Sequence, residues 1–164
     1  MNLPANYAEL ILKLPALEVN YGVGGIKILE ISELEKAQMG YAVSPEGRSL
    51  CGDKDGDWRS DWVVIGNETA LGDPIFIDSA NPKLPVFTAI HGEGAWEPDP
   101  IAISLDAFTK ILHELARIAI GRTNPVEQED NPLTDGDRKA FLALVNKINE
   151  GQIETEFWEA MLED

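Results

Sequence analysis

The sequence predicts an α+β fold in which helices pack on one face of a mostly antiparallel, multi-stranded sheet. Helix-like segments stand at both ends of the chain, and four short strand candidates lie between them. The strands start about a dozen residues apart and are separated by turn residues, a spacing typical of an antiparallel meander. At 164 residues and 44% hydrophobic composition, the chain is the size of one domain with its own core. We therefore expect one domain over residues 1–164, with 122–164 as an acidic helical C-terminal extension.

The N-terminal segment is predicted to be a helix over residues 4–14. Pro4 suits the first helical position, and Pro15 would end the helix. One apolar face is formed by Tyr7, Leu10, Ile11 and Leu14. The glycine-rich residues 15–25 are expected to form a loop, and residues 26–31 a strand.

A second short helix is predicted from a capping box. Ser32 and Glu35 have the S-x-x-E spacing, which opens a helix reaching about Met39. Residues 44–61 are polar and glycine-rich, and we expect a long loop with no buried face of its own.

Four runs of β-branched and aromatic residues form the predicted meander. They are Trp62–Ile65, Ile75–Asp78, Pro85–Ile90 and Ile101–Ser104. Glycine, asparagine and proline between them supply the turns. The sheet face away from the helices is expected to be open to a partner.

The C-terminal part shows the clearest helical pattern, from Leu105 to Ala119. Ser104 is its predicted N-cap and Gly121 its C-cap, with Asp106 and Lys110 spaced for an ion pair. Residues 122–133 are predicted to form an acidic loop. A further helix then begins after Thr134, and a last short, acidic helix is lined by Ile153, Phe157 and Met161.

Charge is the extreme property of the composition. Thirteen Lys and Arg stand against 29 Asp and Glu, which gives a formal net charge of −16. This balance argues against binding nucleic acid or an anionic membrane, both of which need clustered basic residues. A basic protein is the expected partner, drawn in by long-range attraction. Solubility alone also explains an acidic surface.

The N-terminus lacks the pattern of a secretory signal, and no apolar stretch is long enough to span a membrane. The single Cys51 forms no internal disulfide. We expect a cytoplasmic protein, either a monomer or a weak homodimer.

Two motifs approach known metal sites without completing them. His113-Glu114-Leu115-Ala116-Arg117 has Arg117 where a zinc helix needs its second histidine. Asp53, Asp55 and Asp57 open like a calcium loop, but Trp58 and Val64 occupy the places of its required glycine and glutamate. We expect no metal and no cofactor, with weak calcium binding at residues 53–61 as the alternative.

Enzyme chemistry has one candidate, a dyad of Cys51 and His91. Nothing in the spacing brings the two side chains together. A histidine in a turn is more often a structural hydrogen-bonding residue.

Two tryptophans stand beside acidic residues in predicted loops, Trp58 and Trp96. Aromatic and acidic side chains together suit contact with Lys or Arg of a partner. The alternative is that both rings pack at the edge of the core.

A run of motifs in order resembles the SUKH superfamily, the Smi/Knr-like group of bacterial immunity proteins and fungal cell-wall regulators. It reads "IG", "GDPIFID", "PVF", "HG", "W" and "IA-SL--F" over residues 62–112. Its matching residues are Trp62, Gly66, Gly72, Asp73, Ile75, Asp78, Pro85, His91, Ser104 and Phe108. The resemblance implies a Smi/Knr-like α+β domain without catalytic activity, in which the two glycines permit turns, Asp73 and Asp78 hold turn backbone and Trp62, Ile75 and Phe108 fill the core.

The resemblance and the charge together predict an immunity protein that binds and neutralises a cognate toxin. A basic nuclease-type toxin is the expected target, occluded by an acidic surface. The predicted contacts are Asp53, Asp55, Asp57, Trp58, Asp61, Glu93, Trp96, Glu97 and Asp99. The alternatives are a regulatory scaffold without a toxin partner and, more remotely, a small hydrolase using His91.

Overall fold

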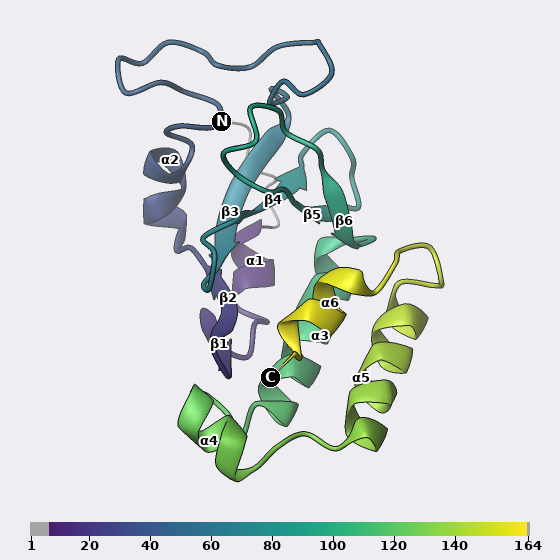
Figure 1. Ribbon diagram of the computed structural model, residues 1–164. Coiled ribbons are helices and arrows are strands. Elements are labelled where there is room, and N and C mark those ends of the chain that lie inside the picture. The colour runs from purple at the N-terminus through teal and green to yellow at the C-terminus, as the bar shows by residue number, and fades with distance from the viewer. Residues whose placement is uncertain (1–6, 164) are drawn as a thin grey trace.

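The computed structural model describes residues 7–163 and is α+β, as the sequence predicts (Figure 1). One six-stranded antiparallel sheet runs in sequence order from β1 to β6. The strands are β1 (Glu18–Tyr21), β2 (Gly24–Ile28), β3 (Trp62–Glu68), β4 (Pro74–Asp78), β5 (Val86–Thr88) and β6 (Asp99–Ala102). The helices are α1 (Tyr7–Ile11), α2 (Leu34–Ala37) with a 3-10 turn at Ile31–Glu33 before it, α3 (Leu105–Ile118), α4 (Pro125–Asp130), α5 (Asp135–Ile148) and α6 (Glu156–Met161). None of the helices in the described range has the length and apolarity needed to cross a bilayer.

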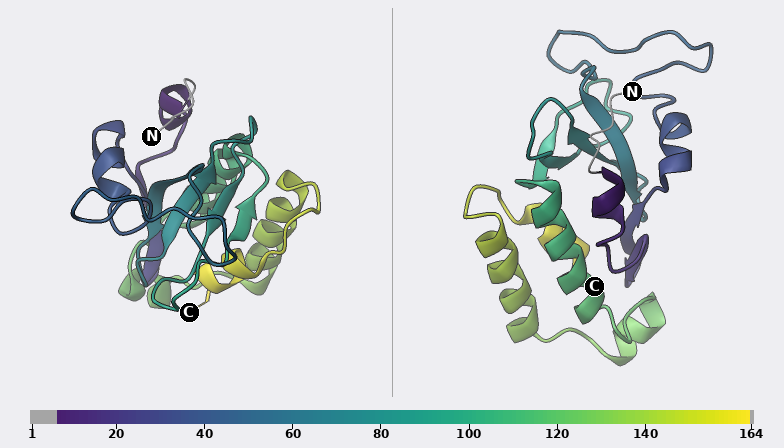
Figure 2. Two further views of the ribbon diagram at one scale, coloured as in Figure 1. Left: turned by 90° about the horizontal axis from the view of Figure 1, so that it is seen from above. Right: turned by 180° about the vertical axis from the view of Figure 1, so that it is seen from behind.

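The main core lies between the sheet and α3. Alternate strand residues point to it, as Ile75 and Ile77 do from β4. From behind, α3 lies in front of the sheet with α1 on one side and α5 on the other (Figure 2). Ser104 caps α3 by accepting the Ala107 N–H at 3.0 Å, which confirms the predicted N-cap. The predicted ion pair of Asp106 and Lys110 is also present, at 2.7 Å.

The opposite face of the sheet carries a second, aromatic core, so it is not the open face that we expected. Trp58 from the 38–61 loop is 1% exposed and packs on Phe76 of β4, with ring centroids 4.8 Å apart. Tyr41 packs at a tilt and Trp96 edge to face against the same indole, with ring centroids 5.1 and 5.3 Å away. The expectation that residues 44–61 bury nothing is therefore wrong, because one large aromatic side chain fixes the loop to the sheet.

A buried glutamine joins α2 to the sheet. The strand β2 pairs with β3 only at residues 66–68, beyond a bulge between Val64 and Gly66. The Gln38 side chain donates to the Val64 carbonyl at 2.9 Å and accepts the Val64 N–H at 3.0 Å. It thereby satisfies the backbone groups that no strand reaches.

Several predicted boundaries are wrong. The predicted loop over 15–25 contains β1 and the start of β2, joined through Gly22 at φ +57°. The capping box lies two residues earlier than expected, with the Glu33 carboxylate accepting the Glu30 N–H at 3.0 Å. Pro4 lies outside the described residues.

The C-terminal part differs from the prediction at three points. The C-cap of α3 is Ala119, and the predicted C-cap Gly121, at φ +69°, follows two residues later. The last helix begins at Glu156, so Ile153 lies outside it. The predicted loop over 122–133 contains α4, whose N-cap Asn124 accepts the Glu127 N–H at 3.0 Å. Thr134 caps α5 as predicted. The last two helices contribute the core side chains Phe141, Val145 and Trp158, and Leu162, which follows α6, joins the same core. The β6 strand ends at Ala102, earlier than predicted, because Ser104 already caps α3.

A candidate acidic cleft

A cleft of about 640 Å³ lies between the β3–β4 turn, the loop that follows β5, and α6. Its volume is within the range of ligand-binding pockets. The lining residues are Val23, Gly24, Glu68, Ala70, Leu71, Asp73, Thr88, Ala89, Ile90, Glu93, Ala95, Glu97, Pro98, Asp99, Phe157, Ala160, Met161 and Glu163. Four separate stretches of the chain therefore build it.

The charge of this cleft has one sign. Six lining residues are acidic, namely Glu68, Asp73, Glu93, Glu97, Asp99 and Glu163. Among the lining residues that the structure describes, none is Lys or Arg. Carboxylates of one sign gathered in a concave site focus the field and raise the local concentration of cations.

The cleft is also apolar at its rim. Val23, Leu71 and Ile90 are 70%, 74% and 61% exposed, and each comes from a different loop. Phe157 and Met161 line its α6 side and are partly buried. An exposed apolar surface beside a concave site is typical of a binding surface.

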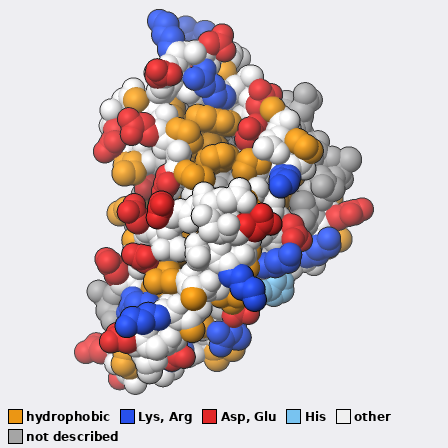
Figure 3. Space-filling view, turned by 90° about the vertical axis from the view of Figure 1, so that its right-hand side faces the viewer, with side chains coloured by type: hydrophobic (Ala, Val, Ile, Leu, Met, Phe, Trp, Pro, Cys, Tyr) orange, Lys and Arg blue, Asp and Glu red, His pale blue; other side chains and the backbone are white. Residues whose placement is uncertain are grey.

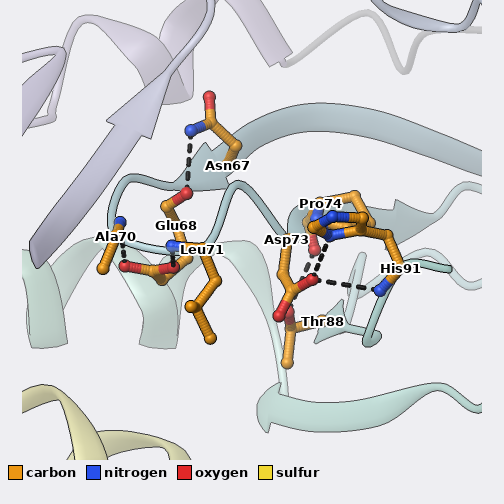
Figure 4. Close-up of polar contacts among 8 residues, drawn as sticks. All are labelled: Asn67, Glu68, Ala70, Leu71, Asp73, Pro74, Thr88 and His91. Carbon is orange, nitrogen blue, oxygen red and sulfur yellow. Dashed lines mark hydrogen bonds and ion pairs between the residues drawn. The ribbon is translucent and has the colours of Figure 1, made fainter.

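Glu68 is the buried acid of the cleft, at 8% exposed. Its two carboxylate oxygens accept the backbone N–H groups of Ala70 and Leu71 at 2.5 and 2.7 Å (Figure 4). The β3–β4 turn thus holds this side chain in place. A carboxylate oxygen has further acceptor capacity beyond one hydrogen bond.

Asp73 ties the β3–β4 turn to the loop after β5. Its Oδ1 accepts the backbone N–H of His91 at 3.0 Å and lies 2.6 Å from His91 Nδ1 (Figure 4). Nearby, the Thr88 hydroxyl donates to the Pro74 carbonyl at 3.1 Å. These contacts fix the position of the loop that carries Glu93 and Glu97.

Asp99 is the cleft acid whose ionisation its surroundings disfavour. Burial raises the pKa of the Asp99 carboxyl, and the nearby Glu156 carboxylate adds to the rise. A bound cation would relieve this repulsion.

Figure 3 shows the side of the molecule that carries β6 and α5. Acidic side chains lie along the left margin of this view, which corresponds to the front of Figure 1, and hydrophobic side chains gather in its upper half.

The seven acidic residues among the predicted contacts fall into three groups. Glu93, Glu97 and Asp99 line the cleft. The turn at residues 53–57 adjoins the same loop, since the Gly56 carbonyl accepts the Trp96 N–H at 2.8 Å. That turn carries Asp53, Asp55 and Asp57, of which Asp57 accepts the Lys54 N–H at 3.0 Å. Asp61 lies immediately before β3, where its carbonyl accepts the Ser79 N–H at 2.8 Å.

The prediction that Trp58 and Trp96 contact a partner is corrected by the packing of their rings. Trp58 is buried in the aromatic core, and its Nε1 donates to the Trp62 carbonyl at 3.2 Å, so the ring is not available to a partner. Trp96 is half-buried against it. The alternative of packing at the core describes both rings, because Phe76 and Tyr41 offer aromatic faces that a loop of polar residues lacks.

The motif residues mostly have the structural places that the resemblance implies. Ile75 and Phe108 are fully buried, Trp62 and Pro85 are half-buried, and Gly72 turns at φ +83°. Asp78 accepts the Ala80 N–H at 2.9 Å. Gly66 lies in the β3 bulge instead of a turn, where a Cβ would collide with the Lys27 carbonyl.

The residues of the metal motifs make other contacts: His113 Nε2 lies 2.7 Å from the Lys13 carbonyl oxygen, and Arg117 Nε donates to Glu114 at 2.8 Å. Within residues 7–163, no three His, Cys, Asp or Glu side chains are placed to hold a metal ion. Cys51 packs on the aromatic core and its thiol faces the Ala42 carbonyl at 3.7 Å. His91 is held by Asp73, and no contact among the described side chains joins it to Cys51.

Sequence reasoning named only three of the lining residues as contacts, Glu93, Glu97 and Asp99, and it missed Val23, Glu68, Leu71 and Ile90. The only signal was the placement of a large aliphatic residue next to a turn glycine, as in Gly22-Val23 and Leu71-Gly72. No family model, curated protein or solved structure matches this chain. The likeness to the Smi/Knr-like group therefore depends on the motif residues and remains a prediction.

Proposed function

We propose that this chain binds a basic protein at the acidic cleft and neutralises it, as an immunity protein neutralises a toxin. The single observation behind the proposal is a 640 Å³ cleft lined by six carboxylates and by no Lys or Arg in the described part of the chain. Such a site attracts cationic groups and repels anionic ones.

The net charge of the whole molecule also favours a basic partner. A net charge of −16 extends the attraction beyond the cleft and favours fast association at low salt. The exposed Leu71 and Ile90 add apolar area that a small inorganic cation would leave in contact with water. A protein partner matches both properties.

The role of the partner comes from the resemblance. The motif residues over 62–112 are similar to those of Smi/Knr-like immunity proteins, so a toxin is the expected target. On this proposal the complex forms in the cytoplasm, where a delivered toxin would act.

A capture experiment with matched charge variants tests the proposal. The wild-type chain is immobilised, source-cell lysate is applied at low salt, and proteins released at high salt are identified. Glu93→Lys with Glu97→Lys reverses two cleft charges, and Glu35→Lys with Glu129→Lys reverses two exposed charges away from it. Both double variants change the net charge equally.

The expected result is one stoichiometric basic protein, lost from the cleft variant and retained by the control. That protein should also arrest growth when expressed alone, and co-expression of this chain should restore growth. Capture of many proteins with equal loss in both variants would contradict neutralisation and favour the scaffold. A captured protein without effect on growth would contradict the toxin role.

A further inference from the structure

We propose that the cleft receives a chain segment that is both basic and aliphatic, with a Lys or Arg head on the inner carboxylates and aliphatic side chains on the rim. This inference deepens the proposed function and depends on it for the identity of the partner protein. The occupant is a peptide segment of the partner, and a small organic cation is the competing outcome of the test.

The rim argues for a segment longer than the cavity. Val23 comes from the β1–β2 turn, Leu71 from the β3–β4 turn, and Ile90 follows β5. One exposed aliphatic side chain is ordinary on a protein surface, but three around one cleft form an apolar patch. A small cation within the cavity would leave these side chains in water, whereas an amphipathic segment covers them.

The interior argues for a cationic head. Glu68 is nine-tenths buried, and the backbone N–H groups of Ala70 and Leu71 already orient its carboxylate. A carboxylate held in place and shielded from water binds a guanidinium or ammonium more strongly than a mobile surface acid does. The turn thus presents a fixed negative charge at the inner wall.

The space beside this carboxylate depends on a glycine. A Cβ on Gly24 would lie 3.1 Å from Glu68 Oε1 and 3.9 Å from Met161 Sδ. A carboxylate and a thioether therefore meet at the same wall, one suited to a charged head and the other to an aliphatic stem. Lys and Arg combine these two parts in one side chain.

The test uses two fluorescent synthetic peptides of equal length and equal positive charge. In one, leucines alternate with the lysines in an amphipathic pattern; in the other, serines replace the leucines. Fluorescence anisotropy measures both affinities for the full chain. We expect the leucine peptide to bind at least about tenfold more tightly, a difference of about 1.4 kcal/mol.

A steric variant separates the cleft from general electrostatics. Ala160→Trp places a large side chain on the cleft wall of α6 without changing any charge. Ala140→Trp makes the same change at an exposed position of α5 outside the cleft. We expect Ala160→Trp to weaken the leucine peptide about tenfold or more and Ala140→Trp to change it less than about twofold. Thermal unfolding of both variants shows that each is folded.

Three outcomes overturn the inference. Equal affinity for the two peptides would mean that charge alone attracts them. Full binding by a folded Ala160→Trp variant would place the peptide elsewhere. Binding of spermidine but not of the leucine peptide, blocked by Ala160→Trp, would make this a site for small organic cations.

The two proposals fail in different ways. Suppose that Ala160→Trp still binds the captured basic protein while the cleft charge variant does not. The proposed function then stands, and the inference that a segment of the partner enters the cleft is wrong. If the leucine peptide binds the cleft but no captured protein arrests growth, the site stands and the neutralising function is wrong.

Discussion

The Gln38 side chain forms the hydrogen bonds at Val64 of β3 that a neighbouring strand would otherwise form. One amide side chain bonds both backbone groups of Val64 and the Leu34 carbonyl. The residue is 5% exposed, so its partners have no water to replace it. No local pattern in the sequence marks this role, because Val64 is 26 residues away.

Replacing Gln38 should therefore be costly. We expect Gln38→Leu to lower the free energy of unfolding by about 3 kcal/mol, since it leaves a buried N–H and two carbonyls without partners. Urea unfolding followed by tryptophan fluorescence measures the change. Gln152→Leu, at an exposed position, is the control and should stay within about 0.5 kcal/mol of wild type. Equal effects of the two variants would show that the Gln38 hydrogen bonds to Val64 and Leu34 do not stabilise the fold.

Asp99 is the acid whose charge the fold disfavours. Burial and Glu156 raise its pKa, so the folded state is penalised when the carboxyl is ionised. The penalty is complete above the folded pKa and disappears as pH falls below the ordinary value of 3.8.

Asp99→Asn should accordingly stabilise the chain at pH 7 by up to about 0.5 kcal/mol and have no stabilising effect at acid pH. Melting temperatures of wild type and variant across the pH range measure the difference. The same variant should bind a basic partner less tightly at pH 7, because it removes one of the cleft charges. A gain that grows toward acid pH would show that the sign is wrong.

At the scale of elements, α6 packs against β6, the strand at one edge of the sheet, and forms a hydrogen bond with it. Trp158 is fully buried, and its Nε1 donates to the Ile101 carbonyl of the edge strand β6 at 3.0 Å. The Arg138 guanidinium joins α5 to the Leu162 carbonyl after α6. Pro100 lacks an N–H, which also makes β6 a poor template for another strand.

Two Trp158 variants should separate the contribution of the buried ring from that of the Nε1 hydrogen bond to Ile101. Trp158→Phe keeps most of the ring and should cost about 1–2 kcal/mol, mainly from the unsatisfied Ile101 carbonyl. Trp158→Ala should cost about 3–5 kcal/mol through lost packing. Denaturant unfolding gives the energies, and light scattering shows whether the freed β6 edge increases aggregation. Equal costs for the two variants would mean that packing by the ring contributes little.

Strong local signals made some elements predictable. The α3 helix has an apolar face and an N-cap hydroxyl, and each signal acts within a few residues. The β1–β2 hairpin was missed because Gly22, Gly24 and Gly25 resemble a loop. Pairing supplied what local propensity did not: Val19 and Tyr21 of β1 pack on the core while their backbone bonds to β2.

At the scale of the whole molecule, like charges oppose folding. A net charge of −16 produces self-repulsion that salt screens, with a Debye length of about 8 Å at 0.15 M ionic strength. We expect the melting temperature to rise as NaCl is raised from a few millimolar to physiological strength. Scanning calorimetry measures it. A falling melting temperature would show that favourable ion pairs outweigh the repulsion.

The sequence by itself determined the fold class, the order of the four central strands, α3 with its cap, and the acidic character of the surface. Each follows from periods, caps or composition, which are properties of neighbouring residues or of simple counts. Only the tertiary structure decided the rest. It buried Trp58 of the 38–61 loop against the sheet and gave Val64 a side-chain partner.

The cleft belongs to this second class. Its walls come from Val23, Glu68, Ile90 and Met161, which are far apart in the chain and meet only because the sheet and α6 bring them together. Sequence reasoning found Glu93, Glu97 and Asp99 by their charge, but it had no means of separating them from Asp61, which lies elsewhere. Charge is a property of residues, whereas a concave site is a property of how distant segments pack.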